Sequence, residues 1–232
     1  MAAEHLHPSP LAATATPIIA AAAAEDAGAL RERTRVARMI LDAAARLLRS
    51  HGYEATTTRS IAQQVGLKPG SIYHHFASKD EIVAAVVSEG VRIVADAVVS
   101  ELAALPAGAE VPTRIETAIR AHLLSSLKNS DYTSASIRAF AFLPDHIRTQ
   151  CRDERRRYED IWRMLMQEAH EGGLIAVGVS PDAVRLMLLG ALNWAGEWYR
   201  PGGLSIEKIA QDFTASILHA RPGDVAAPAS RG

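Results

Sequence analysis

Polar and basic residues gather in one short stretch of the chain, residues 68–79. Long hydrogen-bonding side chains of this kind have little reason to be buried together, so they predict an exposed face. A helix N-terminus rich in Gly and Ser also brings free amide groups close to phosphate. We therefore expect this stretch to bind nucleic acid, with base edges read by Lys68, Gly70, Ser71, Tyr73 and His74. Thr56, Thr57 and Lys79 are expected to clamp backbone phosphates, and His75 completes the predicted DNA-binding set.

Two short helices must hold this face at a fixed angle. A helix is expected to start in the cluster Thr56–Thr58 and to end at Gly66, and Lys68-Pro69-Gly70 then opens a second short helix. Helices of this length are marginal alone in water, so their apolar residues must pack on the preceding helix, which is expected to end near Gly52. This order predicts a helix-turn-helix.

The rest of the chain is also expected to be helical, because apolar residues recur at helical spacing and no segment alternates as a half-buried strand does. The predicted fold is all-α, with an N-terminal three-helix DNA-binding domain and a C-terminal helical domain for ligand binding and dimerisation. Pro144 is expected to open one long helix, and a nearly continuous apolar stripe follows Pro181 as far as Trp198. The expected division is a disordered arm at 1–29, a DNA-binding domain at 30–80, a C-terminal domain at 81–220 and a disordered tail at 221–232.

The distribution of charge supports two parts with different partners. Residues 31–80 carry nine Lys and Arg against four Asp and Glu, a net charge of +5, while the whole chain carries −1. A basic module before an acidic remainder is typical of a DNA-binding unit joined to a domain that binds something else.

The single cysteine, Cys151, excludes an internal disulfide, and a reducing, cytoplasmic location is expected. The apolar run near the N-terminus is too short for a membrane span, so no membrane partner is expected.

Residues 34–83 resemble the DNA-binding pattern of the TetR family. The match includes Gly52-Tyr53, the Thr-rich turn, Ile61-Ala62, and the run from Gly70-Ser71-Ile72-Tyr73-His74-His75-Phe76 to Ser78-Lys79-Asp80-Glu81. One departure is Ser60, where an acidic residue is common in the family. The resemblance implies a ligand-responsive repressor that forms a homodimer through its last two helices, here about residues 181–218. A two-fold dimer predicts a palindromic operator in double-stranded DNA.

Two features of the C-terminal half suggest the effector. The segment Trp194-x-x-x-Trp198-Tyr199-Arg200-Pro201-Gly202-Gly203 is similar to its counterpart in TetR-type repressors of sterol or fatty-acid catabolism that respond to acyl-coenzyme A thioesters. Five arginines also follow Cys151, beside aromatic residues, and an apolar cleft with guanidinium groups at its mouth would suit an acyl chain on a phosphorylated carrier. The residues expected to bind this effector are Phe140, Arg155, Tyr158, Trp162, Met166, Trp194, Trp198 and Arg200.

Simpler interpretations of these features stay open. Arginines beside Asp153, Glu154, Glu159 and Asp160 can form a solvated helix face with ion pairs, and the Trp and Met residues can belong to the core or the dimer contact. A regulator of drug efflux or stress that binds a hydrophobic molecule is the alternative function.

Other classes are less well supported by the residues. No nucleophile motif, phosphate loop or zinc-protease motif is present in the sequence, so neither an enzyme nor a cofactor is expected. A DNA-compacting protein would carry a far more positive total charge. Adjacent His74 and His75 diverge by about 100° on a helix and would not share a metal ion. Cys151 is expected to be structural, with a redox sensor as the alternative.

Overall fold

The computed structural model describes residues 10–128 and 131–219, and these residues form helices without any strand. The predicted all-α fold is therefore confirmed. No helix among these residues is long and apolar enough to cross a bilayer. The elements in chain order are α1 (Pro10–Ala55), α2 (Thr58–Gln64), the 3-10 helix η1 (Pro69–His74), α3 (Lys79–Ala103), α4 (Val111–Leu127), α5 (Asp131–Phe140), α6 (Asp145–Gln150), α7 (Arg152–Glu171), α8 (Pro181–Asn193), α9 (Ala195–Trp198) and α10 (Ile206–Ile217).

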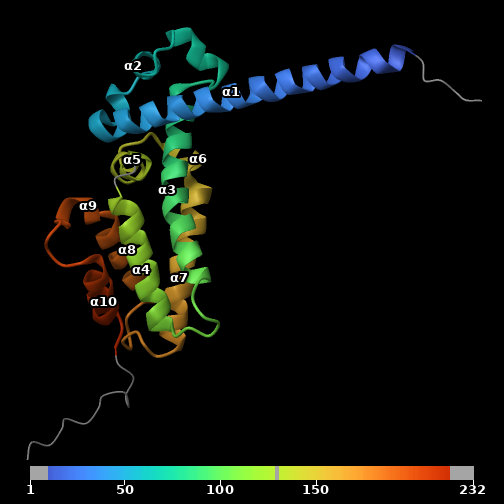
Figure 1. Cartoon of the computed structure of the whole chain (residues 1–232). Helices are drawn as coiled ribbons and strands as arrows, with labels where there is room; N and C mark the ends of the chain where they lie inside the picture. Colours follow the sequence, from blue (N-terminus) through green and yellow to red (C-terminus); the bar gives the residue numbers. More distant parts are fainter. Residues whose placement is uncertain (1–9, 129–130, 220–232) are drawn as a thin grey trace, which may run out of the picture.

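Helix α1 lies across one end of the molecule, with α2 on its outer side and α5 beneath it (Figure 1). It begins at Pro10, inside the segment 1–29 that the sequence analysis expected to be disordered. Residues 1–9 and the predicted tail at 221–232 lie outside the described residues. The expected break at Gly52 is confirmed, because this residue has φ 74°, a left-handed value that favours glycine.

The helix-turn-helix follows directly. Thr57 caps α2 by accepting a hydrogen bond from the Ser60 amide at 3.0 Å, and the Ser60 hydroxyl accepts one from the Thr57 amide at 3.0 Å. Ser60 thus completes a capping box, with its hydroxyl in the position that a carboxylate usually takes. Gly66, with φ 70°, then turns the chain into η1. The second helix is therefore a 3-10 helix with Pro69 in its first turn, and not an α-helix.

The long helix α3 connects the two halves of the molecule. Ser78 caps it by accepting a hydrogen bond from the Glu81 amide at 3.1 Å, while the Glu81 carboxylate accepts one from the Ala77 amide at 2.6 Å. The first turns of α3 pack in the N-terminal core, and its later turns pack in the C-terminal core. Helix α3 therefore runs away from α1 into the C-terminal bundle (Figure 1).

Two hydrophobic cores lie along this helix. One core joins α4, α7, α8 and α10 around the fully buried Trp162. The other core joins α1, α2 and η1 to α5 and α6, so Tyr132 and Ile147 pack with the helix-turn-helix although they lie beyond the predicted boundary at residue 80. The helix-turn-helix and the first helices of the C-terminal half consequently pack in one hydrophobic core.

The C-terminal half contains two breaks that the periodicity did not predict. The helix expected after Pro144 is divided at Cys151 into α6 and α7, and the stripe expected to end at Trp198 is divided at Trp194 into α8 and α9. Apolar spacing continues across both points, so only tertiary packing determines where the backbone turns.

Candidate DNA-binding surface and ligand cavity

The outer side of the helix-turn-helix presents polar groups that the rest of the chain leaves unused. Tyr73 is 59% exposed, while Ile72, next to it in η1, is completely buried and anchors the element. Lys68 and His74 are also exposed. Within the described residues, none of these three polar side chains makes a hydrogen bond or an ion pair with another residue. They are available to a DNA groove without breaking internal contacts.

The remaining predicted DNA contacts differ in exposure. Thr57 and Gly70 lie at the surface, whereas Ser71, His75 and Lys79 are half-buried. The His75 Nδ1 atom is shielded from solvent, so this residue faces partly inward. The Lys79 Nζ atom lies 3.8 Å from the centroid of the Tyr53 ring, an arrangement that holds its ammonium group beside the start of α3.

One predicted DNA contact is wrong. Thr56 is completely buried, and its hydroxyl donates a hydrogen bond to the Gly52 carbonyl at 2.7 Å. Its side chain therefore caps the end of α1 and does not reach a phosphate. The neighbouring Thr57 is the exposed member of the pair, because the chain between α1 and α2 is extended and successive side chains point in opposite directions.

The start of α3 is tied to the end of α1 and to α6. The Tyr53 hydroxyl donates to the Asp80 carboxylate at 2.6 Å, and the other oxygen of Asp80 lies 2.8 Å from Nε2 of His146. These two bonds hold the pKa of Asp80 below its usual value. Burial and the hydrogen bond to Asp80 raise the pKa of Tyr53 to about 12, so the phenol keeps its proton. Asp80 thus connects the helix-turn-helix with the C-terminal half.

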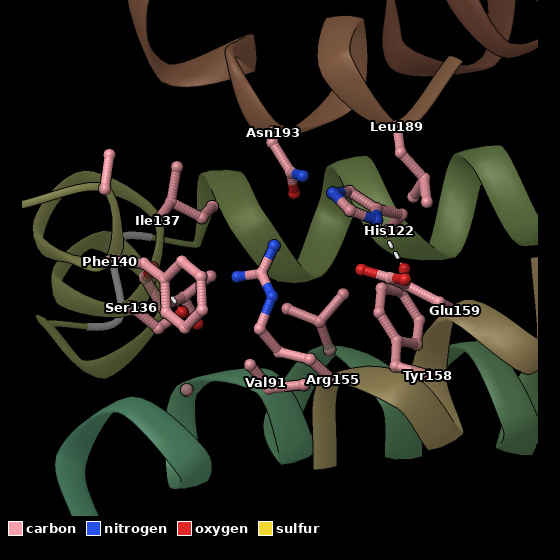
Figure 2. Close-up of a pocket in the computed structure, with 14 residues that line it drawn as sticks. Val91, His122, Ser136, Ile137, Phe140, Arg155, Tyr158, Glu159, Leu189 and Asn193 are labelled. Carbon is pink, nitrogen blue, oxygen red and sulfur yellow. Dashed lines mark hydrogen bonds between the residues drawn. The ribbon is translucent and has the colours of Figure 1, made fainter. Parts of the chain in front are cut away.

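A cavity of about 220 Å³ lies between α3, α4, α5, α7 and α8 (Figure 2). We call it the central cavity. Gly90 stands where α3 and α5 approach most closely, since a Cβ atom there would lie only 2.3 Å from the Tyr132 carbonyl oxygen. The lining residues are Gly90, Val91, Val94, His122, Thr133, Ser136, Ile137, Phe140, Ala141, Arg155, Tyr158, Glu159, Leu189 and Asn193.

Arg155 carries the main positive charge of the central cavity. Its guanidinium carbon lies 4.0 Å from the centroid of the Phe140 ring, and no carboxylate among the described residues pairs with it. Burial lowers the pKa of Arg155 from its ordinary value, although guanidinium stays protonated in proteins. The negative charge of Glu159, which also lines the cavity, opposes this shift. A half-buried guanidinium group without an ion pair among the described residues can still donate hydrogen bonds to an anion or a polar oxygen that enters the cavity.

A second hollow of about 460 Å³ adjoins the central cavity. We call it the arginine groove, and it shares Phe140, Arg155 and Glu159 with the central cavity. Two of its arginines are neutralised, because Arg148 pairs with Asp145 and Arg163 pairs with Asp160. Arg152 and Arg156 form no ion pair with any described carboxylate. The groove therefore places a cationic surface next to a mainly apolar space.

The structure brings together only some of the predicted ligand residues. Phe140, Arg155 and Tyr158 line the central cavity. Trp162 and Met166 belong to the buried core, so their assignment to the ligand site is wrong for this cavity. Trp194, which is 61% exposed, lines a different surface hollow, and Trp198 and Arg200 line another one beside Phe213. These three residues do not reach the central cavity.

His122 and Asn193 are two of the polar cavity residues that the sequence did not indicate; Thr133, Ser136 and Glu159 are the others. His122 is 1% exposed and lies on the buried face of α4 with Ile115 and Ile119. A histidine on an otherwise apolar helical face was the available signal, but such residues are more often satisfied core groups. Asn193 gave no signal, because it ends a helix whose pattern indicated a dimer contact.

Two family models match the chain. The model described as "Bacterial regulatory proteins, tetR family" matches residues 40–86, and the model described as "Tetracyclin repressor-like, C-terminal domain" matches residues 108–220. The chain belongs to the TetR family of bacterial regulatory proteins. The predicted class, a ligand-responsive DNA-binding repressor of the TetR type, is thereby confirmed.

Individual relatives agree with this assignment. The chain is 27% identical over 189 residues to the HTH-type transcriptional repressor KstR2 of Mycolicibacterium smegmatis, which covers 77% of this chain and 87% of that protein. A crystal structure of AibR in complex with isovaleryl coenzyme A and operator DNA superposes with a TM-score of 0.68 and 26% identity over 78% of this chain and 97% of that one. The crystal structure of superantigen PfiT has a TM-score of 0.65 and 32% identity over 77% and 94% of the respective chains.

Proposed function

We propose that this regulator binds a palindromic operator as a homodimer and is released by an acyl-coenzyme A thioester. The observation that carries the proposal is that Arg155 lines both the mainly apolar central cavity and the arginine groove. An acyl chain attached to a phosphorylated carrier needs an apolar cavity and a cationic groove side by side. A purely hydrophobic effector would need only the apolar cavity.

The two parts of the effector match the two spaces. The acyl group occupies the central cavity between Val91, Ile137 and Leu189, which border it on different sides (Figure 2). The phosphates lie along the groove near Arg152 and Arg156, whose guanidinium groups have no carboxylate partner among the described residues and offer bidentate hydrogen bonds. Support comes from AibR, whose crystal structure contains isovaleryl coenzyme A.

The central cavity favours a short acyl group. Pockets for drug-sized ligands span about 300–1,000 Å³, whereas the central cavity measures about 220 Å³. A branched or straight chain of a few carbons matches this volume better than a fused ring system. The similarity to the repressor KstR2 supports the regulatory class and does not determine the effector.

For the DNA contact, we assign base reading to Lys68, Ser71, Tyr73 and His74, with Gly70 allowing close approach of the backbone. Thr57 and Lys79 hold phosphates on either side of η1. The support is the exposure of Thr57, Lys68, Gly70, Tyr73 and His74, together with the absence of competing internal contacts for Lys68, Tyr73 and His74 within the described residues.

For the dimer, we assign the contact to the outer face of α8 together with α10. Leu186, Met187 and Trp194 are each about 60% exposed, and Gly190 lies between them on the same face with open space around it. Exposed apolar side chains at helical spacing around a glycine permit close packing against a second copy of the helix. This places the contact within residues 181–218, as expected from the family.

Helix α5 connects the cavity with the DNA-binding half. One side of α5 contacts α1, since the Tyr132 hydroxyl donates to Asp42 at 2.7 Å and Asp131 lies 2.8 Å from Arg49. Its other side carries Ser136, Ile137 and Phe140 into the central cavity. A ligand that displaces these residues must shift a helix already bonded to α1, which supplies a physical route to the DNA-binding surface.

The proposal is tested by fluorescence anisotropy of the full chain on its own upstream DNA. Increasing concentrations of acetyl-, butyryl-, isovaleryl- and palmitoyl-coenzyme A are compared with coenzyme A, free acids and unrelated hydrophobic drugs. Release by short thioesters alone is expected. Release by drugs but by no thioester would instead identify a drug- or stress-responsive regulator and would overturn the effector assignment.

A further inference from the structure

His122 is a buried polar residue in the wall of the central cavity. Its Nδ1 atom lies 2.5 Å from the Tyr158 hydroxyl oxygen, while its Nε2 atom is buried and has no hydrogen-bond partner among the described residues. Figure 2 shows the ring between Tyr158 and Asn193, with the nitrogen opposite the dashed bond turned toward the side where Asn193 and the Arg155 guanidinium lie. One polar atom is therefore buried and directed at the space that a ligand would fill.

The hydrogen bond determines which nitrogen carries the proton. Burial lowers the pKa of His122 to about 3, so the ring is neutral and carries one N–H group. Burial also raises the pKa of Tyr158, so its phenol stays protonated. The roles in this bond depend on the tautomer, and because the phenol has no other acceptor among the described residues, we assign the phenol as the donor to Nδ1. The single imidazole proton consequently resides on Nε2, which is a neutral donor facing the cavity.

The donor lines the central cavity but not the arginine groove. Arg155 borders both spaces, whereas His122 borders only the central cavity. If phosphates occupy the groove, the thioester group lies near Arg155 and the rest of the acyl chain extends toward His122 and Asn193. An acyl chain made only of methylene and methyl groups would leave the Nε2–H group buried without an acceptor, which is unfavourable.

We infer that the central cavity selects a short acyl group that carries a hydroxyl or keto oxygen beyond the thioester carbonyl, with His122 as the donor to that oxygen. This inference rests on the proposed function. The volume is adequate, since about 220 Å³ equals about seven groups of the ~30 Å³ that a water molecule occupies in the liquid. A site built to hydrogen-bond a ligand oxygen discriminates strongly against the analogue that lacks it.

The test is isothermal titration calorimetry of the full chain with 3-hydroxybutyryl-, acetoacetyl- and butyryl-coenzyme A, which share four acyl carbons. The oxygenated thioesters are expected to bind at least about tenfold more tightly than butyryl-coenzyme A. In His122→Leu this ratio is expected to fall to about one. The control His170→Leu changes an exposed histidine at the end of α7 and should leave the ratio unchanged.

A second variant covers the case in which His122→Leu does not fold. Tyr158→Phe keeps the imidazole but removes the group that assigns its proton. We expect the tautomer-sensitive ¹⁵N chemical shifts to report a proton on Nε2 in the unaltered protein and a mixture in Tyr158→Phe, with a smaller preference for oxygenated thioesters.

The outcomes separate the two proposals. Equal binding of butyryl- and 3-hydroxybutyryl-coenzyme A would overturn the selection of an oxygenated chain and leave the thioester effector standing. Binding of no thioester would overturn both. A preference that survives both His122→Leu and Tyr158→Phe would assign the selection to another residue and contradict the role of His122.

Discussion

The DNA-binding surface and the central cavity are constructed in different ways. The surface comes from one continuous stretch, residues 57–79, whose turns and caps are local. The cavity takes its lining from five helices between Gly90 and Asn193. Local backbone geometry positions the first, while packing between distant helices positions the second. A motif can therefore identify the surface, but no short pattern describes the cavity.

The electrostatics of the two regions differ in the same way. Lys68 at the DNA-binding surface is exposed, so solvent screens its charge and many side-chain positions are open to it. Arg155 in the cavity is stacked on Phe140 and partly removed from water, so its contacts with a ligand are stronger and more specific in geometry. Changes in the cavity should consequently have the larger energetic effects.

The largest effect is expected from Arg155→Met, which would weaken thioester binding by about 30-fold or more, because loss of a buried charged partner costs about 2–5 kcal/mol. Operator affinity without effector should be unchanged. The measurement is calorimetric titration with the best thioester. Arg157→Met is the matched control, since Arg157 lies on the same helix but is exposed and paired with Glu154. Equal losses in both variants would contradict a specific role for Arg155.

Tyr73→Ala at the DNA-binding surface should have the opposite pattern, with a loss of operator affinity and no change in thioester affinity. Operator affinity is expected to fall by about 10- to 100-fold, because a base contact contributes about 1–3 kcal/mol. Thioester affinity and thermal stability should stay the same, since Tyr73 is 59% exposed and has no internal partner among the described residues. Anisotropy with operator and scrambled DNA measures the effect. Met164→Ala, an exposed truncation on α7, is the control, and unchanged operator binding in Tyr73→Ala would place the reading face elsewhere.

Gly90→Ala should affect both regions, because α3 passes through both. The added Cβ would lie 2.3 Å from the Tyr132 carbonyl and 2.7 Å from Ser136 Cβ, so overpacking is expected to cost about 1–3 kcal/mol despite the better helix propensity of alanine. Thermal unfolding should shift downward by several degrees. Gly70→Ala, with no atom within 4 Å of the new Cβ, should leave the unfolding midpoint in place. Equal unfolding midpoints for Gly90→Ala and Gly70→Ala would mean that α3 and α5 can move apart without lowering the stability of the fold.

Tyr132→Phe tests the connection between the two regions. It removes the hydrogen bond to Asp42 and should reduce the coupling between effector and operator by about 0.5–2 kcal/mol. The coupling is measured as the ratio of operator affinities without and with saturating thioester. Tyr199→Phe, whose hydroxyl has no described hydrogen-bond partner, is the control. An unaltered ratio in Tyr132→Phe would show that α5 does not transmit the signal through Asp42.

The smallest change is expected from Lys79→Ala. Loss of one phosphate contact should lower the slope of log affinity against log salt by about one unit, for operator and non-specific DNA alike. The measurement is a salt titration on both DNAs. Lys128→Ala, an exposed lysine at the end of α4, should leave the slope unchanged. A loss confined to the operator would assign Lys79 to base reading.

Much of the fold could be predicted from the sequence, because its signals act over a few residues. Gly52 and Gly66 each turn the chain where their type and position indicated, and Pro69 begins the second short helix. The site was predicted less well. Thr56 and Thr57 are indistinguishable by residue type, and only the direction of the extended chain buries one and exposes the other. Trp162 and Met166 share a helix with Arg155 but lie in the core, because residues on one helix face different partners.

The sequence by itself determined the family, the all-helical fold and the position of the helix-turn-helix, since these depend on residue types at short spacing. Only the tertiary structure decided that Arg155, His122 and Asn193 line one cavity, although they come from three helices far apart in the chain. It also decided where the helix pairs α6–α7 and α8–α9 break. The physical reason is that the hydrophobic effect has no preferred direction. The spacing of apolar residues predicts that a helix face is buried, but only the close packing of the helices determines which buried faces meet.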